Sequence, residues 1–429
     1  MKERDGEGRG DMGRLLAITA TVGVLAVGAA PPQPTAPARP VGAARIAPAR
    51  AAAPAAGPGR GAGACTPRWR IVPGPDTGTS YFAGVAAISP QAVWAAGSVG
   101  VGTAGQPLAA RWDGRNWRVA GGALRAAHTS PFFGYGSGAA LVAVAALTPR
   151  DVWAVGSTVT AAGARPLVAH WTGAAWRAVA TPDPGADARL RAVAALSARD
   201  VWAVGDVRGR ALIEHWDGRA WRIVATPPVG GRDVLLSGIA APAAADIWAV
   251  GSRGSAGDSS RRGLIEHWDG ARWRVTPSPQ PGVIDDTLSG VAAGAADDVW
   301  AVGSVEGADY EDAPLVERWD GRAWRAVAAP ALPPVQGSLD AVAVRSPRDV
   351  WAVGGGSLAH WTGTRWGTTT VRTSPYVSGV DFWDASTPYF AAVTATPSGG
   401  LWAVGRVTVN TDEQYTPLIA QYDAPPACR

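Results

Sequence analysis

Hydrophobic positions fall in short apolar runs, four to each stretch of about 51 residues, with turn residues between them. The second run of a unit reads Val-Trp-Ala-Val-Gly, as at 299–303, and the third ends in an aromatic residue followed by Asp-Gly, as at 319–321. Another tryptophan, five residues after that aromatic, opens the fourth run. Runs of this length, bounded by Gly, Pro and Asp, are typical of β-strands, and Asp-Gly between two of them predicts a tight hairpin.

We name these four predicted strands A to D in chain order. A lone four-stranded sheet leaves both faces exposed, whereas sheets stacked radially bury their tryptophans against each other. Four strands repeated at this period therefore predict an all-β fold, a seven-bladed β-propeller. The seven B-strand tryptophans are Trp94, Trp153, Trp202, Trp248, Trp300, Trp351 and Trp402.

The seventh unit is incomplete. It has strands A to C and ends at 422–424 without a D strand. The missing D-like run, Arg-Trp-Arg-Ile-Val, stands instead at 68–72. We expect this N-terminal strand to complete the last blade and close the ring.

The two cysteines flank the hairpin that the chain ends divide. Cys65 lies four residues before Trp69, and Cys428 lies six residues after Tyr422. We predict a disulfide between them, with two free thiols as the alternative. By the chain-entropy model, a loop this long contributes about 5–6 kcal/mol as an upper bound.

The first 30 residues resemble a secretory signal peptide. Basic residues at 2, 4, 9 and 14 precede an apolar run from Leu15 to Ala30, and Pro31 ends it. Sixteen helical residues reach about 24 Å, less than the roughly 30 Å hydrocarbon core of a bilayer. We expect residues 1–30 to be a signal peptide, with an uncleaved anchor as the alternative, and the protein to be secreted or associated with the cell envelope. No later apolar run is long enough to span a membrane, and cleavage is expected near Ala29 or Ala38, with Met1 or Met12 as the start.

Residues 31–64 consist almost entirely of Ala, Pro, Gly and Arg, a composition that predicts a disordered linker before a propeller at 65–429. The formal charge of the whole chain is +4, but residues 65–429 sum to about zero. We therefore expect no nucleic-acid partner, because such a partner needs a basic face on the folded domain. The hydrophobic content of 47% and the two cysteines exclude a fully disordered chain and a disulfide-rich miniprotein.

The repeat resembles kelch-type propeller units. The hydrophobic strand ending in Gly303, the Trp319-Asp320 pair and Trp324 follow the kelch order. The glycine doublet is present only at 354–355, and tryptophan takes the place of the usual kelch tyrosine except at Tyr422. The repeat is also similar to exported proteins of high-GC actinobacteria with the same Val-Trp-Ala-Val-Gly and His-Trp-Asp-Gly pattern. This resemblance covers about 69–423 and implies the propeller fold but no single activity.

Residues that recur in every blade lie at one radius and height, so we interpret them as scaffold. Four histidines precede the C-strand aromatic, and three glutamates precede the histidine or arginine at that position: His170, His215, His267 and His360, then Glu214, Glu266 and Glu317. Because the histidines lie on separate blades, they are too far apart to share a metal. We expect no metal and no cofactor, and the chain has no motif that assigns a catalytic residue.

The A–B and C–D turns are nearly constant in length, whereas the B–C and D–A connections vary. The two variable sets emerge on one face, which we call the loop face, and variable loops on a rigid scaffold are where binding residues concentrate. Aromatic residues outside the repeat positions are the binding candidates, because exposed rings stack on sugars and anchor protein interfaces. They are Trp383, Phe382, Tyr135, Phe132, Phe133, Tyr310, Tyr376 and Tyr415, with Tyr81 and Tyr389 as further members; packing within their own loops is the alternative.

Carboxylates also gather in these connections, at 285–286, 306–312 and 412–413. We interpret them as solvated charge rather than as a calcium site or a catalytic pair. The sequence thus predicts an exported, monomeric binding module that recognises a glycan or a cell-surface or extracellular protein. The alternatives are a carbohydrate-active hydrolase or lyase that uses the loop carboxylates and a non-catalytic structural protein of the envelope.

Overall fold

The computed structural model describes residues 68–100, 105–121, 138–254, 260–282, 284–307, 312–332, 337–371, 388–408 and 415–423. The predicted signal peptide, the linker and both cysteines of the predicted disulfide lie outside these residues. The described ranges contain strands β1 to β28 and no helix, so they include no helix that would cross a membrane.

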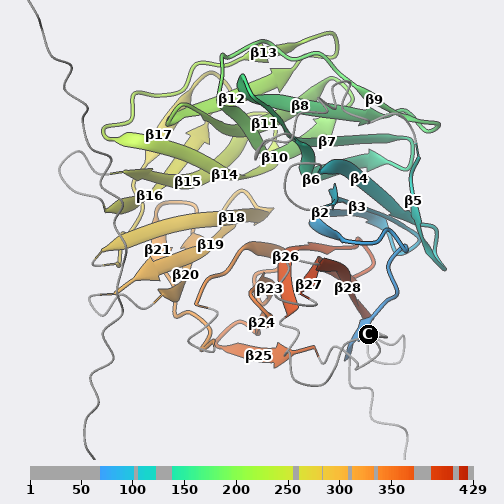
Figure 1. Ribbon diagram of the computed structural model, residues 1–429. Coiled ribbons are helices and arrows are strands. Elements are labelled where there is room, and N and C mark those ends of the chain that lie inside the picture. The colour runs from blue at the N-terminus through green and yellow to red at the C-terminus, as the bar shows by residue number, and fades with distance from the viewer. Residues whose placement is uncertain are drawn as a thin grey trace, which may run out of the picture. The chain divides into compact units, whose positions relative to one another are not determined.

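The strands form seven antiparallel four-stranded sheets arranged in a ring, which confirms the predicted seven-bladed propeller (Figure 1). Blades 1 to 4 are β2 (Ser80–Ser89), β3 (Ala92–Val99), β4 (Gln106–Trp112) and β5 (Trp117–Val119); β6 (Gly138–Thr148), β7 (Asp151–Thr160), β8 (Gly163–Trp171) and β9 (Trp176–Ala178); β10 (Ala188–Ser197), β11 (Asp200–Val207), β12 (Arg210–Trp216) and β13 (Trp221–Ile223); and β14 (Arg232–Ala243), β15 (Asp246–Gly254), β16 (Arg261–Trp268) and β17 (Trp273–Thr276). Blades 5 to 7 are β18 (Asp285–Ala295), β19 (Asp298–Glu306), β20 (Asp312–Trp319) and β21 (Trp324–Ala326); β22 (Ala341–Ser346), β23 (Asp349–Gly354), β24 (Ser357–Trp361) and β25 (Trp366–Thr370); and β26 (Pro388–Ala395), β27 (Leu401–Thr408), β28 (Tyr415–Asp423) and β1 (Arg68–Ile71).

The ring closes as the sequence predicts. Strand β1 pairs antiparallel with β28, with Trp69 opposite Tyr422 and Ile71 opposite Ala420. The first described strand is therefore the outer strand of the last blade, and the two ends of the described chain are hydrogen-bonded neighbours.

The B strands are covered on both faces by neighbouring blades. In β7, Val152, Trp153 and Val155 are all at most 1% exposed. A strand buried on both faces reads as a continuous apolar run rather than as an alternating one. This explains the Val-Trp-Ala-Val sequence of these strands.

The tryptophans join each blade to the next. The ring of Trp94 in blade 1 lies 5.1 Å from that of Trp171 and 5.5 Å from that of Trp176, both in blade 2. The same arrangement recurs at every blade interface, including the two that involve blade 7. Aromatic pairs at such distances stabilise a fold beyond the area that they bury.

The C–D hairpins are built around an aspartate. In blade 3, Oδ1 of Asp217 accepts hydrogen bonds from the backbone N–H groups of Arg219 and Ala220, and Oδ2 accepts one from Arg222 Nε at 3.0 Å. The bond from Ala220 is the largest of the contacts that lower the pKa of this carboxyl to about 2. Blades 1, 4 and 5 repeat the arrangement, so these acids are already paired within their own hairpins.

Candidate functional site

Of the ten aromatic residues predicted as binding candidates, Tyr81, Tyr389 and Tyr415 lie among the described residues. Tyr415 begins strand β28 on the loop face. The remaining seven predicted residues lie outside the described ranges: Trp383, Phe382, Tyr135, Phe132, Phe133, Tyr310 and Tyr376. The described strands on either side of those segments all end at the loop face.

The structure brings Tyr415 together with Arg406 and two other tyrosines in a group that we call the Tyr–Arg cluster. The guanidinium carbon of Arg406 lies 4.4 Å from the ring centre of Tyr389 and 5.1 Å from that of Tyr415. The ring of Tyr81, on β2 of blade 1, meets that of Tyr415 edge-on at 6.4 Å. The cluster therefore spans the interface between blade 7 and blade 1.

Arg406 is a departure from the repeat. It stands four residues after the B-strand tryptophan, where blades 1, 2, 4 and 5 have the serines Ser98, Ser157, Ser252 and Ser304. A position that is serine in most blades and arginine in one is not explained by the scaffold. Alignment of the blades position by position would have found Arg406, whereas the search for aromatic residues outside the repeat passed over it.

A pocket of about 380 Å³ opens beside Tyr415. Its lining comes from the connection between β1 and β2 and from the start of β28: Gly74, Pro75, Asp76, Thr77, Gly78, Thr79, Tyr415, Thr416 and Pro417. The pocket thus exists only because β1 completes blade 7 and the chain then crosses to blade 1.

Burial perturbs the ionisable groups of this region. It raises the pKa of Asp340 to about 6, although a hydrogen bond from the Tyr389 hydroxyl opposes the rise. Burial and the nearby Asp340 carboxylate raise the pKa of Tyr389 to about 12. The guanidinium of Arg406 makes no ion pair within the described residues. Its charge acts to lower the pKa of the Asp340 carboxyl, but the two groups are not in contact. Among the described residues, the N–H groups of Arg406 therefore have no anionic partner in contact.

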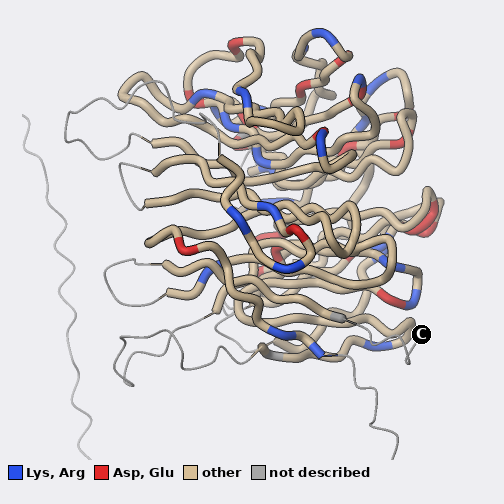
Figure 2. Tube along the Cα trace, turned by 90° about the vertical axis from the view of Figure 1, so that its right-hand side faces the viewer, with Lys and Arg blue, Asp and Glu red and all other residues tan. Residues whose placement is uncertain are grey.

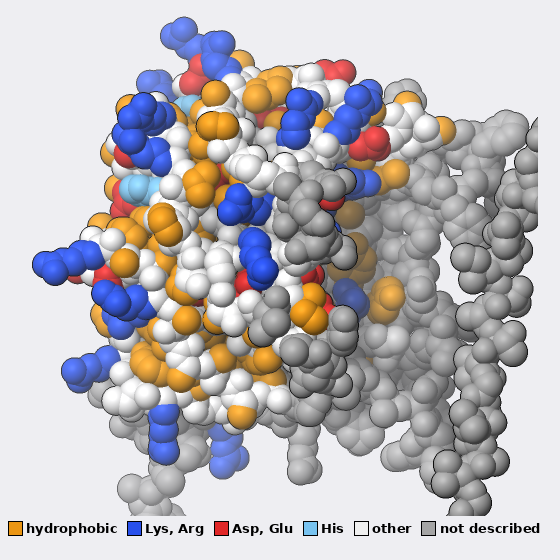
Figure 3. Space-filling model, turned by 90° about the vertical axis from the view of Figure 1, so that its left-hand side faces the viewer, with side chains coloured by type: hydrophobic (Ala, Val, Ile, Leu, Met, Phe, Trp, Pro, Cys, Tyr) orange, Lys and Arg blue, Asp and Glu red, His pale blue; other side chains and the backbone are white. Residues whose placement is uncertain are grey.

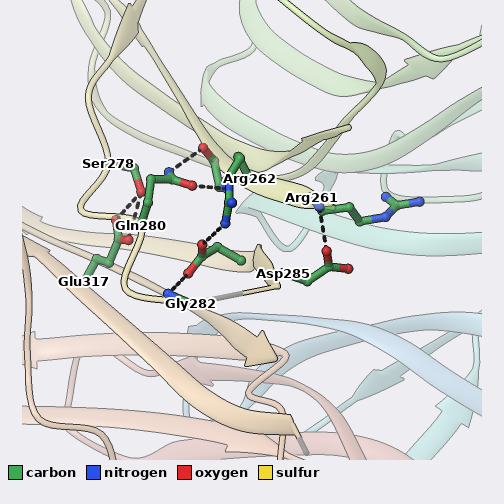
Figure 4. A network of polar contacts seen from close by, with 9 residues as sticks. Arg261, Arg262, Ser278, Gln280, Gly282, Asp285 and Glu317 are labelled. Atoms are coloured by element: carbon green, nitrogen blue, oxygen red, sulfur yellow. Dashed lines mark hydrogen bonds and ion pairs between the residues drawn. The ribbon is translucent and has the colours of Figure 1, made fainter. Parts of the chain in front are cut away.

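The carboxylates at 285–286 are structural, which corrects their interpretation as solvated charge. Asp286 is fully buried; it accepts a hydrogen bond from the Gly282 N–H at 2.7 Å and faces Arg262 Nη1 at 3.4 Å. Asp285 accepts a bond from the backbone N–H of Arg261 at 2.6 Å. Figure 4 shows Asp285 bonded to Arg261, and together with the contact of Asp286 to Arg262 this ties the start of blade 5 to blade 4. A carboxylate bound in this way is not available as a catalytic acid or base.

Each repeated histidine is held within its own blade. His215 Nε2 lies 2.8 Å from Oδ1 of Asp200, and its ring stacks on Trp202 at 4.2 Å. His170, His267 and His360 repeat these contacts, and in blade 5 Arg318 takes the same place over Trp300. In the part of the chain that the structure describes, no group of His, Cys, Asp and Glu is arranged to hold a metal ion.

The fold and this site define the class of protein: a seven-bladed β-propeller with a cationic aromatic cluster and a pocket on its loop face. Its fold is similar to that of YCF48 from Cyanidioschyzon merolae, at 14% identity over 83% of this chain and 99% of that chain, with a TM-score of 0.52. It is also similar to U3-55K, at 10% identity over 82% of this chain and 98% of that chain, with a TM-score of 0.50. A structure of YCF48 bound to a D1 peptide has 16% identity over 82% of this chain and 96% of that chain, with a TM-score of 0.48.

No family model matches the chain, and no curated protein matches it. At the identities of the solved structures, the likeness shows the fold alone.

Proposed function

We propose that this protein is an exported binding module that recognises a glycan or an extracellular protein through its loop face, with the Tyr–Arg cluster and its pocket as the centre of the site. The observation that carries the proposal is Arg406, a charged departure from the repeat whose guanidinium lies between two tyrosine rings. A guanidinium placed beside aromatic rings can still donate its N–H groups to an acidic group of the ligand. The exposed parts of the tyrosines would pack on the rest of the ligand.

A ligand is first identified on a glycan array or a panel of acidic peptides. Replacement of Arg406 by glutamine is expected to lower the affinity for that ligand by about tenfold to a hundredfold, the contribution of a charge-assisted hydrogen bond. Tyr415→Ala should lower the affinity for the same ligand. Trp383→Ala combined with Tyr135→Ala should lower it too if these sequence-predicted aromatic residues share the site. The matched control is Arg191→Gln, a loop-face arginine that is already paired with Asp206 at 2.8 Å. Equal binding by the parent and by Arg406→Gln would rule out the cluster.

Of the loop carboxylates, Asp285 and Asp286 are bound to backbone and arginine groups, and Asp309, Glu311, Asp412 and Glu413 lie outside the described residues. Glu306 and Asp312 stand opposite each other on β19 and β20, and loss of glycan turnover on their replacement would be the result that favours a hydrolase or lyase. A purely structural envelope protein would bind neither glycans nor peptides through the loop face, so the binding measurement distinguishes that role as well.

Export is part of the proposal, and it rests on the basic and apolar segments at 1–30. The kelch-like character of the repeat and an actinobacterial source belong to it too, on the residue pattern of 299–303 and 319–324.

Intact-mass measurement on the protein from a secreting host is expected to show removal of the first 29 to 38 residues. Peptide mapping without reduction should recover Cys65 linked to Cys428, since an exported chain reaches an oxidising compartment. Full-length protein with two alkylatable thiols would contradict both export and the disulfide.

A further inference from the structure

The face opposite the loop face, which carries the A–B and C–D turns and which we call the turn face, has a charge pattern that the net charge of the chain conceals. Eight arginines on these turns are exposed: Arg115, Arg150, Arg199, Arg219, Arg272, Arg322, Arg348 and Arg365. Figure 2 shows charged positions at the turns along the right-hand edge of the ring, and Figure 3 shows arginine side chains projecting from the corresponding left-hand edge.

These arginines make no ion pair with the groups around them in the described part of the chain. The aspartates of the C–D turns are already bonded to their own hairpins and to D-strand arginines, as Asp217 is to Arg222. The aspartates that begin the B strands are bonded to C-strand side chains, as Asp200 is to His215. Asp297 is the one exposed turn acid, among the residues described, with no such partner.

Three of the arginines are positioned by glycine. A Cβ added to Gly218 would lie 2.6 Å from Cγ of Arg199, and one added to Gly363 would lie 2.8 Å from Cγ of Arg348. Both glycines have positive φ, +89° and +97°, so the hairpin requires glycine there and the arginine stem lies across it. Arg150 lies across Gly173 in the same way.

The packing over glycine places two arginines together on single blades. In blade 3, Arg199 lies across Gly218, and Arg219 is the next residue in the chain. Blade 6 carries Arg348 and Arg365 on the same pair of turns. The turn face is therefore an ordered array of guanidinium groups with one or two on most blades.

We propose that the turn face binds an acidic polysaccharide, a chain of sugars that carries carboxylate groups along its length. A guanidinium presents N–H pairs that match a carboxylate, and guanidinium groups distributed one or two to a blade match a chain of separated carboxylates better than the continuous phosphates of a duplex. A bilayer is a poorer match because the exposed large hydrophobic residues of the described chain, Ile71, Val119, Ile223 and Val275, are all on D strands and not on these turns.

Binding to polygalacturonate at low ionic strength tests this surface. Arg199→Gln with Arg219→Gln is expected to weaken binding about fivefold, from two exposed ion pairs of up to about 1 kcal/mol in total. Adding Arg348→Gln and Arg365→Gln should bring the loss to about twenty-five-fold if the two blades act independently. Added salt should weaken binding by the parent protein, because the contacts are solvent-exposed.

The matched control is Arg208→Gln with Arg210→Gln, which removes the same charge from exposed positions of the same blade on the loop face. All variants are compared by thermal unfolding and are tested again with Arg406→Gln, so that binding by the Tyr–Arg cluster is measured separately. An equal loss in the control pair, the absence of polygalacturonate binding, or tighter binding to duplex DNA or to phosphatidylglycerol vesicles than to polygalacturonate would overturn the proposal.

Discussion

The propeller is expected to lose several kcal/mol of folding stability as the pH rises from about 5 to about 9, because three buried glutamates must ionise in the folded state. Glu214, Glu266 and Glu317 are 0% exposed, and the carboxylates of the first two have no hydrogen-bond partner. Burial raises their pKa values from 4.5 to about 7, about 8 and about 7 respectively. These glutamates, interpreted as scaffold from the sequence, are therefore fully internal.

The direction follows from proton binding. A folded-state pKa above the unfolded value means that the folded protein holds more protons between the two values, so its free energy of unfolding falls as pH rises through that window. The window here runs from 4.5 to about 8, and Asp340, with its pKa raised to about 6, adds to the same fall. Asp217 and Asp320, whose pKa values are lowered to about 2, act in the opposite direction but only below the ordinary aspartate pKa of 3.8.

Chemical denaturation of the parent protein and of the Glu214→Gln, Glu266→Gln, Glu317→Gln triple variant across this pH range measures the effect. The variant should lose most of the pH dependence, and at high pH it should be the more stable protein, by up to about 3–5 kcal/mol per glutamate, which is the free-energy equivalent of the pKa shifts. Glu306→Gln, at a half-buried strand position, is the control for the effect of a Glu-to-Gln substitution itself. A parent protein whose stability is flat or rising from pH 5 to 9 would contradict the prediction.

Each buried glutamate occurs together with a hydroxyl residue in the preceding blade. In the three blades that precede them, a hydroxyl residue stands five positions after the D-strand tryptophan, at Thr181, Thr226 and Ser278. Ser278 donates a hydrogen bond to Glu317 at 2.9 Å, from the connection that runs past it. Blade 6 has Ala359 at the glutamate position and Ala329 at the hydroxyl position before it. Thr181 and Thr226 make no such bond to Glu214 and Glu266, so the pairing of positions accompanies a hydrogen bond only for Glu317.

Replacement of Trp402 by alanine is expected to lower the free energy of unfolding by about 3–5 kcal/mol, the cost of removing a fully buried large aromatic side chain. Trp402 is 1% exposed, and its ring lies 5.1 Å from that of Trp112 and 5.4 Å from that of Trp117. These contacts cross from blade 7 to blade 1, the interface at which the last blade meets the first. The substitution therefore opens a cavity where the ring closes.

Denaturation with urea measures the change. Trp402→Phe should recover most of the loss because it restores a ring in the same space, and Val119→Ala, on an exposed residue of β5, should change stability by less than about 0.5 kcal/mol. A loss below about 1 kcal/mol for Trp402→Ala would mean that the interface between blades 7 and 1 contributes little, and the packing account of the ring would then be wrong.

Comparison of the blades shows which features of the fold and of the candidate site could be predicted from the sequence. The repeat of Val-Trp-Ala-Val-Gly and the Asp-Gly hairpins predicted the strands, and the absent D strand after Tyr422 predicted the pairing of β1 with β28. These are local patterns, and each is set by strand burial or by turn chemistry. Tyr415 was predicted as a binding candidate, but its neighbour Arg406 was not. The contact between them depends on side chains from two strands that approach only after blade 7 is formed.

Taken alone, the chain determined its architecture: the number of blades, the closure of the ring, and the separation of constant turns from variable connections, because each unit repeats the same short-range patterning. The tertiary structure decided which charged and aromatic side chains are buried and which lie together on the surface. It buried Asp286 and Glu266, which any count of charges treats as solvated, and it gathered Arg406 with tyrosines from two blades. It also gathered arginines that a net charge of about zero conceals onto one face of the ring, because the direction in which a side chain points is set by the register of its strand in the closed propeller.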